Sequence, residues 1–215
     1  MQRQAKDLAA ARRDRRLEEL KQLFLREGFL HFGTEELARR LQCSKRALYQ
    51  IAPSRGELFE EAVESWLAEL RHSGNEAAAR APDPLTAVTD YLGAAIIATR
   101  DASAQFVRDL SRYPATYRRL MRHQRERITG LEQLIERGTA RGHFRGVHPK
   151  LVAEVMLNAV AQLVDPEVLA RVGLTMSEGF AEFYDIVEHG LLPQNARRAR
   201  ASRNGRSRPR RAARR

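Results

Sequence analysis

The stretch LQCSKRALYQIAPSRGELF, residues 41–59, decides the fold because two helix starts and a helix stop lie close together in it. Ser44 is placed to cap a short helix, which Pro53 ends. SRGE, residues 54–57, is a capping box that opens a longer helix, since its Ser and Glu satisfy each other's backbone amides. The stretch predicts a short helix with two cations in its first turn, followed closely by a long helix.

Apolar residues recur at helical spacing on both sides of this stretch, and we find no convincing strand pattern. Upstream we expect a helix from about Asp7 to Arg26 and a short one over Thr34–Leu41. Downstream, the periodicity and the start and stop signals predict helices from 54, from 84, at 104–110, 114–138, 148–164 and 175–190. The sequence therefore predicts an all-α protein of about nine helices.

The composition changes after His72 to SGNEAAARAPDP, which is typical of a boundary between units. We predict an N-terminal domain at 1–72 that includes the start of the fourth helix, and a larger helical domain at 73–194. Residues 195–215 hold ten arginines and no acidic residue, so without them the net charge of +11 falls to +1. We expect this tail to be disordered and to attract polyanions without sequence preference, or to be merely solubilising.

Several protein classes are disfavoured by the sequence. The longest apolar run, Leu92–Ala98, is too short to cross a bilayer, and the N-terminus has no signal-peptide pattern. The single cysteine and the lack of a signal-peptide pattern together predict a cytoplasmic protein without disulfides. The six histidines are scattered, and neither a phosphate-binding glycine loop nor a nucleophile elbow is present. We therefore expect no enzyme activity, no cofactor and no metal.

The two short helices around Gln42 have the proportions of a helix-turn-helix, whose second helix enters a DNA major groove. In that helix Arg46 can bind guanine, Gln50 can read adenine, Lys45 can meet phosphate or guanine, and Tyr49 can donate to phosphate. The alternative for each is a solvated surface residue, or for Tyr49 a core tyrosine.

The segment from Arg16 to Leu70 resembles the DNA-binding domain of the TetR family of transcriptional regulators. The resemblance rests on the motifs LFLREGF, FGTEELARRL, QCS, KRALYQIA and PSRGELF, which keep the family's spacing. It implies DNA contacts from the following residues: Thr34, Ser44, Lys45, Arg46, Tyr49, Gln50 and Arg55. The chain departs from the family pattern at Phe32-Gly33, Arg46-Ala47, Ile51-Ala52 and Arg55-Gly56, so its DNA sequence preference is its own.

The C-terminal part predicts self-association and a ligand pocket. The helix at about 148–164 is apolar on more than one side, and the helix at 175–190 has a strong apolar stripe. Two copies of this pair, the eighth and ninth expected helices, would form a four-helix homodimer interface, unless both are buried within one chain. Candidate pocket walls are aromatic or flexible apolar residues that could equally be plain core: Trp66, Tyr91, Phe106, Tyr117 and Met121.

Together these features favour a repressor that binds a double-stranded DNA operator and is released by a small-molecule effector of unknown identity. Two alternatives stay open. One is an effector-independent DNA-binding protein assisted by its basic tail, and the other is a helical ligand-binding protein or enzyme with a vestigial DNA-binding head.

Overall fold

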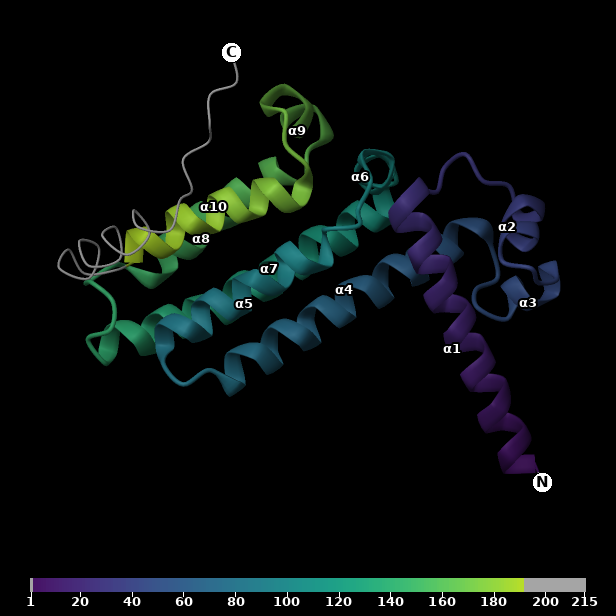
Figure 1. Cartoon of the computed structure of the whole chain (residues 1–215), viewed down its shortest axis with the longest axis horizontal. Coiled ribbons are helices and arrows are strands. Elements are labelled where there is room, and N and C mark those ends of the chain that lie inside the picture. Colours follow the sequence, from purple (N-terminus) through teal and green to yellow (C-terminus); the bar gives the residue numbers. More distant parts are fainter. Residues whose placement is uncertain (1, 192–215) are drawn as a thin grey trace, which may run out of the picture.

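The structure, a computed structural model, describes residues 2–191, and the side chains of Gln4 and of residues 7–191 within that range. This part of the chain is all-helical (Figure 1). Its elements are α1 (Gln2–Glu27), α2 (Thr34–Arg40), α3 (Lys45–Tyr49), α4 (Arg55–Arg80), α5 (Pro84–Ala98), α6 (Ala104–Arg112), α7 (Pro114–Ala140), α8 (Pro149–Leu163), α9 (Pro166–Val172) and α10 (Met176–Leu191). The predicted tail at 195–215 lies outside the described residues.

Local capping explains why the elements around the deciding stretch begin where they do. The Ser44 hydroxyl accepts a hydrogen bond from the Ala47 amide at 3.2 Å and caps α3. Ser54 accepts from the Glu57 amide at 3.2 Å and donates to its carboxylate at 3.0 Å. The predicted cap and capping box are therefore confirmed, and each satisfies backbone groups that a helix end leaves unpaired.

Within residues 2–191 there is one helix more than the nine we expected, because the short α9 lies between α8 and α10. Asp165 caps it by accepting from the Glu167 amide at 2.8 Å, and Pro166 occupies its first turn. Gly173 ends it in the left-handed conformation, at φ 71°. These signals are present in the sequence, but a seven-residue helix carries too little apolar periodicity to stand out.

α4 continues past His72 through Ser73 and Gly74 to Arg80. The predicted domain boundary after residue 72 thus falls inside a continuous helix. A glycine within a helix costs about 1 kcal/mol relative to alanine. Here its small size has a use, because a Cβ on Gly74 would lie 2.9 Å from the Arg127 guanidinium.

The C-terminal body is a layered bundle in which α4, α5 and α7 pack on one another, with α10 against α5 and α8 against α7 (Figure 1). The short α9 contacts α6 and α8. At the other end of α4, helices α1, α2 and α3 form the N-terminal head. None of the helices in the described part of the chain is long and apolar enough to cross a membrane.

The core of the head is aromatic. The rings of Phe29 and Phe59 stack with their centroids 4.1 Å apart, and Phe24 meets both edge-on at 5.2 and 5.7 Å. All three side chains are at most 1% exposed. Because Phe59 lies in the first turns of α4, this cluster fixes the head directly onto the helix that leads into the body.

A single buried carboxylate joins the head to α6. Asp109 accepts from the amides of Phe29 and Leu30 at 2.6 and 2.8 Å, in the loop between α1 and α2. The loop leaves α1 at Gly28 with φ 83°, and a Cβ there would lie 2.5 Å from Gln105 and 2.7 Å from Asp109. Only glycine allows this turn and this close approach together.

Candidate DNA-binding surface and ligand cleft

The short helix α3, which the sequence predicts as the recognition helix, separates its apolar and polar residues cleanly. Ala47 and Leu48 are buried against the head, as the sequence predicted. Arg46 and Tyr49 point to the outside, where the Tyr49 side chain is 47% exposed. Within the described residues Arg46 has no hydrogen-bond or ion-pair partner, so its guanidinium is available to an external acceptor.

Lys45 is held in place by an acidic residue of the preceding helix. Its ammonium forms an ion pair with Glu35, in the first turn of α2. This hydrogen bond lowers the pKa of Glu35 and raises the pKa of Lys45. Both side chains are exposed to water, where such pairs are worth little, so a phosphate can compete for the lysine.

Thr34, Ser44 and Gln50 lie at helix ends of the head. Thr34 is the half-exposed first residue of α2, whose cap, Gly33, makes no side-chain hydrogen bond, as expected from the lost hydroxyl. Ser44 caps the start of α3, and the exposed Gln50 caps its end. The DNA-contact role of each stays a prediction.

Arg55 makes hydrogen bonds within the head that the sequence did not indicate. One of its guanidinium nitrogens donates to the carbonyl of Phe32 at 2.7 Å and to that of Leu30 at 3.3 Å. The guanidinium carbon also lies 5.3 Å from the centre of the Phe29 ring. Arg55 therefore ties the loop before α2 to the start of α4, and a phosphate would have to share it.

Arg13 is a residue of this surface that sequence reasoning missed. Its guanidinium donates to the carbonyls of Gln50 and Ile51 at 3.3 and 3.2 Å, at the C-terminal end of α3. It also lies 3.7 Å from the carboxylate of Glu61 on α4. No local pattern links Arg13 to residues nearly forty positions away, so only the folded chain reveals that it positions the recognition helix.

The five predicted pocket residues do not line one cavity. Trp66 meets the ring of Phe106 edge-on at 5.3 Å. Tyr91 donates its hydroxyl to the Arg127 carbonyl at 2.9 Å. Tyr117 is 38% exposed, and Met121 packs partly buried against the core.

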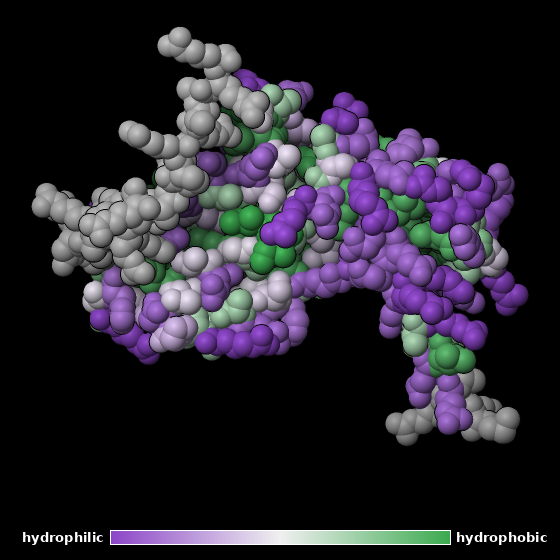
Figure 2. Space-filling model, viewed as in Figure 1, coloured by the Kyte–Doolittle hydropathy of each residue, from purple (hydrophilic) through white to green (hydrophobic). Residues whose placement is uncertain are grey.

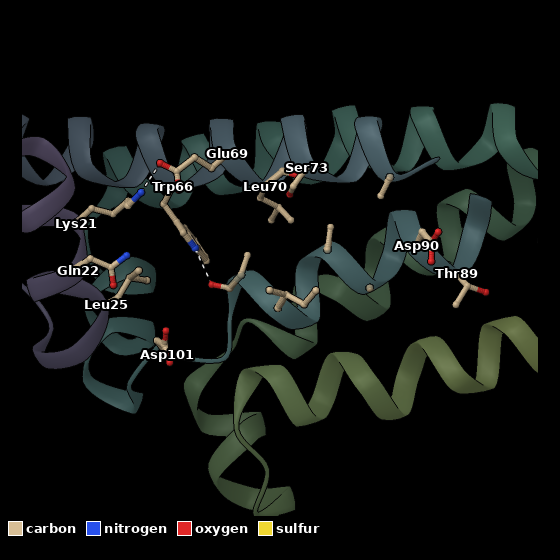
Figure 3. Close-up of a pocket in the computed structure, with 15 residues that line it drawn as sticks. Lys21, Gln22, Leu25, Trp66, Glu69, Leu70, Ser73, Thr89, Asp90 and Asp101 are labelled. Atoms are coloured by element: carbon tan, nitrogen blue, oxygen red, sulfur yellow. Dashed lines mark hydrogen bonds and ion pairs between the residues drawn. The ribbon is translucent and has the colours of Figure 1, made fainter. Parts of the chain in front are cut away.

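A cleft of about 650 Å³ lies between α1, α4 and α5 (Figure 3). Trp66 is the one predicted pocket residue that lines it, with its indole N–H donating to the Ala98 carbonyl at 2.9 Å. The lining of the cleft is mainly apolar, and it also includes the carboxylates of Asp90 and Asp101. Lys21, which is only 3% exposed, is neutralised by Glu18 and Glu69.

The interior of the body holds a buried cation, Arg127, and a buried histidine, His123. Arg127 is 4% exposed and donates to the Tyr91 carbonyl at 2.7 Å. Its guanidinium carbon lies 4.5 Å from the centre of the Tyr91 ring. Nε2 of the fully buried His123 has no hydrogen-bond partner within the described residues. Burial, reinforced by the charges of Arg127 and Arg71, lowers the pKa of His123 to about 3, so the imidazole is neutral.

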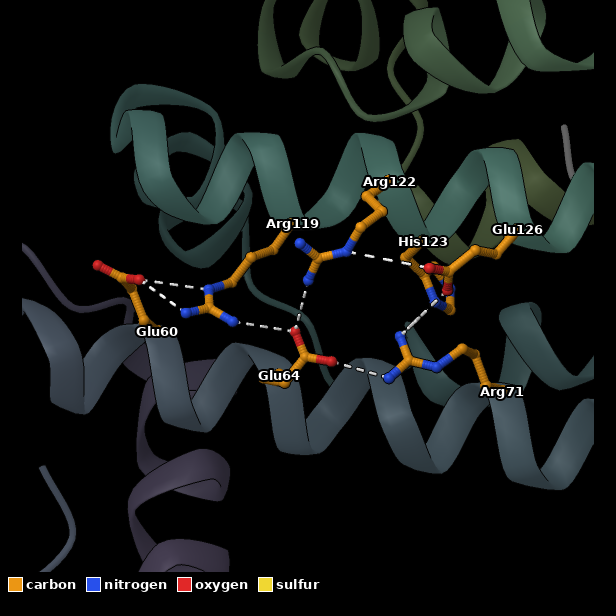
Figure 4. Close-up of polar contacts among 7 residues, drawn as sticks. All are labelled: Glu60, Glu64, Arg71, Arg119, Arg122, His123 and Glu126. Atoms are coloured by element: carbon orange, nitrogen blue, oxygen red, sulfur yellow. Dashed lines mark hydrogen bonds and ion pairs between the residues drawn. The ribbon is translucent and has the colours of Figure 1, made fainter.

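An ion-pair network beside His123 joins α4 to α7 (Figure 4). Arg119 binds Glu60 at 2.9 Å and Glu64 at 3.2 Å, and Arg71 binds the other oxygen of Glu64 at 2.8 Å. Partial burial acts to raise the pKa of Glu64, but the hydrogen bonds and charges of Arg71 and Arg119 outweigh it and leave that pKa lowered. The network couples the two longest helices of the body.

Comparison with known proteins identifies the head. Residues 17–62 match the family model for bacterial regulatory proteins of the tetR family. The chain carries a TetR-family DNA-binding domain on a TetR-family fold. The matched TetR segment includes α2, α3 and the first turns of α4, so the resemblance found in the sequence is confirmed. No curated protein matches the chain.

Solved structures of transcriptional regulators share the fold over most of the chain. A TetR-family regulator from Agrobacterium tumefaciens is 18% identical, with a TM-score of 0.66, covering 86% of this chain and all of that one. PfmR from Thermus thermophilus is 22% identical, with a TM-score of 0.59, covering 83% and 100%. A protein from Saccharomonospora viridis, assigned as a transcriptional regulator and solved in complex with choline, is 15% identical with a TM-score of 0.66, covering 86% and 100%.

Proposed function

We propose that this TetR-family protein is a cytoplasmic homodimeric repressor, without enzyme activity, that leaves its DNA operator when a small molecule binds the C-terminal body. The observation that carries the DNA-binding part is the outer face of α3. It presents Arg46, without a partner among the described residues, beside the exposed Tyr49 and the weakly paired Lys45. A guanidinium in this position is suited to bidentate contact with guanine in the major groove.

The apolar residues exposed on α8 and α10 support the dimer. Leu151 and Val155, one turn apart on α8, are 62% and 58% exposed, while Met156 and Val160 on the other side are buried. On α10, Ile186 is 68% exposed. A second copy that covers these residues would form the four-helix interface expected from the sequence, with two recognition helices about one DNA turn apart.

The cleft between α1, α4 and α5 supports the effector part, because it touches both the head and the body. Its walls come from α1 of the head and from α4 and α5, so a ligand there would bear on the relative position of these helices. Such a ligand acts only through different affinities for the DNA-bound and free states. Trp66 is the single tryptophan of the chain, so its fluorescence gives a direct readout of effector candidates.

Selection of binding sites from random duplex DNA tests the function, followed by Arg46→Ala on the selected site. We expect a loss of about 1–3 kcal/mol and relaxed preference at one base pair, because a base contact is removed. Arg141→Ala is the matched control, since Arg141 is an exposed arginine of the body at the end of α7. A failure to enrich any site, or equal binding by Arg46→Ala and wild type, would contradict the proposal.

Deletion of residues 195–215 separates the proposal from the effector-independent alternative. A site-specific repressor keeps its selectivity and loses mainly salt-sensitive, non-specific affinity, whereas a protein that relies on the basic tail loses most of its DNA binding. Sedimentation at micromolar concentration tests the dimer, with Val155→Asp expected to shift it to the monomer.

A further inference from the structure

The N-terminal half of α1 projects away from the rest of the molecule (Figure 1). Its described side chains before residue 13 are all exposed, including Leu8 at 55%, and the first buried one is Leu20. At 1.5 Å per residue, the segment from Gln2 to Arg13 extends about 16 Å beyond the point where α1 reaches the recognition helix. Tertiary packing does not account for this extension.

The charge of this segment is unfavourable for an isolated helix. Residues 2–16 contain six basic and two acidic residues, for a net charge of +4, and the first turn of α1 has no acidic residue. Cations near a helix N-terminus oppose the helix dipole, and they also repel one another. Figure 2 shows the projecting part as mainly hydrophilic. An anionic partner would relieve both effects, whereas a second copy of the same segment would worsen them.

The extension is anchored at one end of the DNA-reading helix. Arg13 bonds the carbonyls of Gln50 and Ile51, so the projecting segment starts directly beside the C-terminal end of α3. Arg12, Arg15 and Arg16 lie within three residues of Arg13, or about 5 Å along α1. With α3 in a major groove about 12 Å wide, they therefore lie near the bounding phosphate strand at this end of α3. The nearest polyanion is therefore the DNA backbone that flanks the sequence read by α3.

Three cations are suitably placed for this contact. Arg12, Arg15 and Arg16 are spaced i, i+3 and i+4, which puts them on one side of α1. Arg12 and Arg15 are exposed and Arg16 is half-buried, and none has an ion-pair partner among the described residues. We propose that residues 2–16 form a second DNA-contacting helix, whose Arg12, Arg15 and Arg16 bind backbone phosphates just outside the half-site. The inference rests on the proposed DNA-binding function and adds a sequence-independent contact to it.

The test compares two triple variants of the full chain on the selected site and on unrelated duplex, over a series of KCl concentrations. Arg12→Gln/Arg15→Gln/Arg16→Gln removes the proposed contacts with a residue that favours helices as arginine does. The matched control, Arg125→Gln/Arg137→Gln/Arg141→Gln, removes the same charge from exposed positions on α7 and at its end. Fluorescence anisotropy gives the dissociation constants, and hydroxyl-radical footprinting gives the protected backbone.

We expect the slope of log K against log salt concentration to fall by about 3 for the α1 variant, at about 0.9 per lost phosphate contact. Affinity should fall at least tenfold on both DNAs, with an unchanged selectivity ratio and lost protection only at the flanks. Equal slopes and footprints for the α1 variant and the α7 control would overturn the inference. A wild-type chain that selects no site would instead overturn the proposed function, so the two failures are distinguishable.

Discussion

The head and the body of this protein differ in the kind of side chain that they bury. The head encloses stacked phenylalanines and leaves Lys45 and Arg46 outside, whereas the body encloses Arg127 and His123. Buried aromatic surface stabilises directly, but a buried charge loses hydration that a carbonyl and a ring face replace only in part. A dry core gives the head one rigid shape, which suits the proposed DNA binding, and a polar interior would make the body sensitive to the proposed effector.

The joint between the head and the body combines apolar packing with buried polar contacts. Phe59 connects the head cluster to α4 by apolar packing, and Asp109 connects α6 to the head loop by hydrogen bonds to amides. Substitutions in the head core, at the joint and in the body interior should therefore differ in size and in their response to pH.

The largest effect is expected from Phe59→Ala. Loss of the fully buried Phe59 side chain leaves a cavity beside the rings of Phe24 and Phe29 and should lower the free energy of unfolding by about 3–5 kcal/mol. Urea denaturation followed by circular dichroism measures it. Leu8→Ala, at an exposed position of α1, is the control and should change stability by less than about 0.5 kcal/mol. Similar losses for the two variants would mean that the aromatic cluster does not hold the head.

An intermediate effect is expected from Asp109→Ala. The amides of Phe29 and Leu30 lose their acceptor in a buried place, which should cost about 2–3 kcal/mol. Asp109→Asn keeps one acceptor oxygen and should recover part of the loss. Because the loop orients the head, DNA affinity should fall in the same order. Full DNA affinity in a destabilised Asp109→Ala protein would show that the joint stabilises the chain without orienting the head.

The smallest effect is expected from His123, and it depends on pH. Its pKa is about 3 in the folded chain against 6.5 for the free side chain, so the unfolded state binds a proton first as the pH falls. The stability contribution is complete above pH 6.5 and is lost at up to about 1.4 kcal/mol per pH unit below it. His123→Gln should flatten this dependence between pH 6.5 and 5, whereas the exposed His72→Gln should not. Parallel slopes in all three proteins would contradict the burial of a neutral imidazole.

Much of the head could be predicted from the sequence because its signals are local. Ser44 and Ser54 cap their helices through amides three residues away, and Ala47 and Leu48 face inward by helical spacing alone. The body was less predictable, since Ser73 and Gly74 look like a linker in the sequence. They continue α4 because Gly74 packs against Arg127 of α7, a contact that no local pattern encodes.

The sequence by itself determined the all-helical class, the helix starts and the TetR-like head, because capping, periodicity and motif spacing act over a few residues. Only the tertiary structure decided which side chains form contacts within the chain. It assigned Arg55 to two loop carbonyls and Arg13 to the end of α3, and it placed Trp66, but not Tyr91, in the lining of the cleft. These outcomes depend on residues brought together from distant parts of the chain, and such proximity is set by packing rather than by order along the sequence.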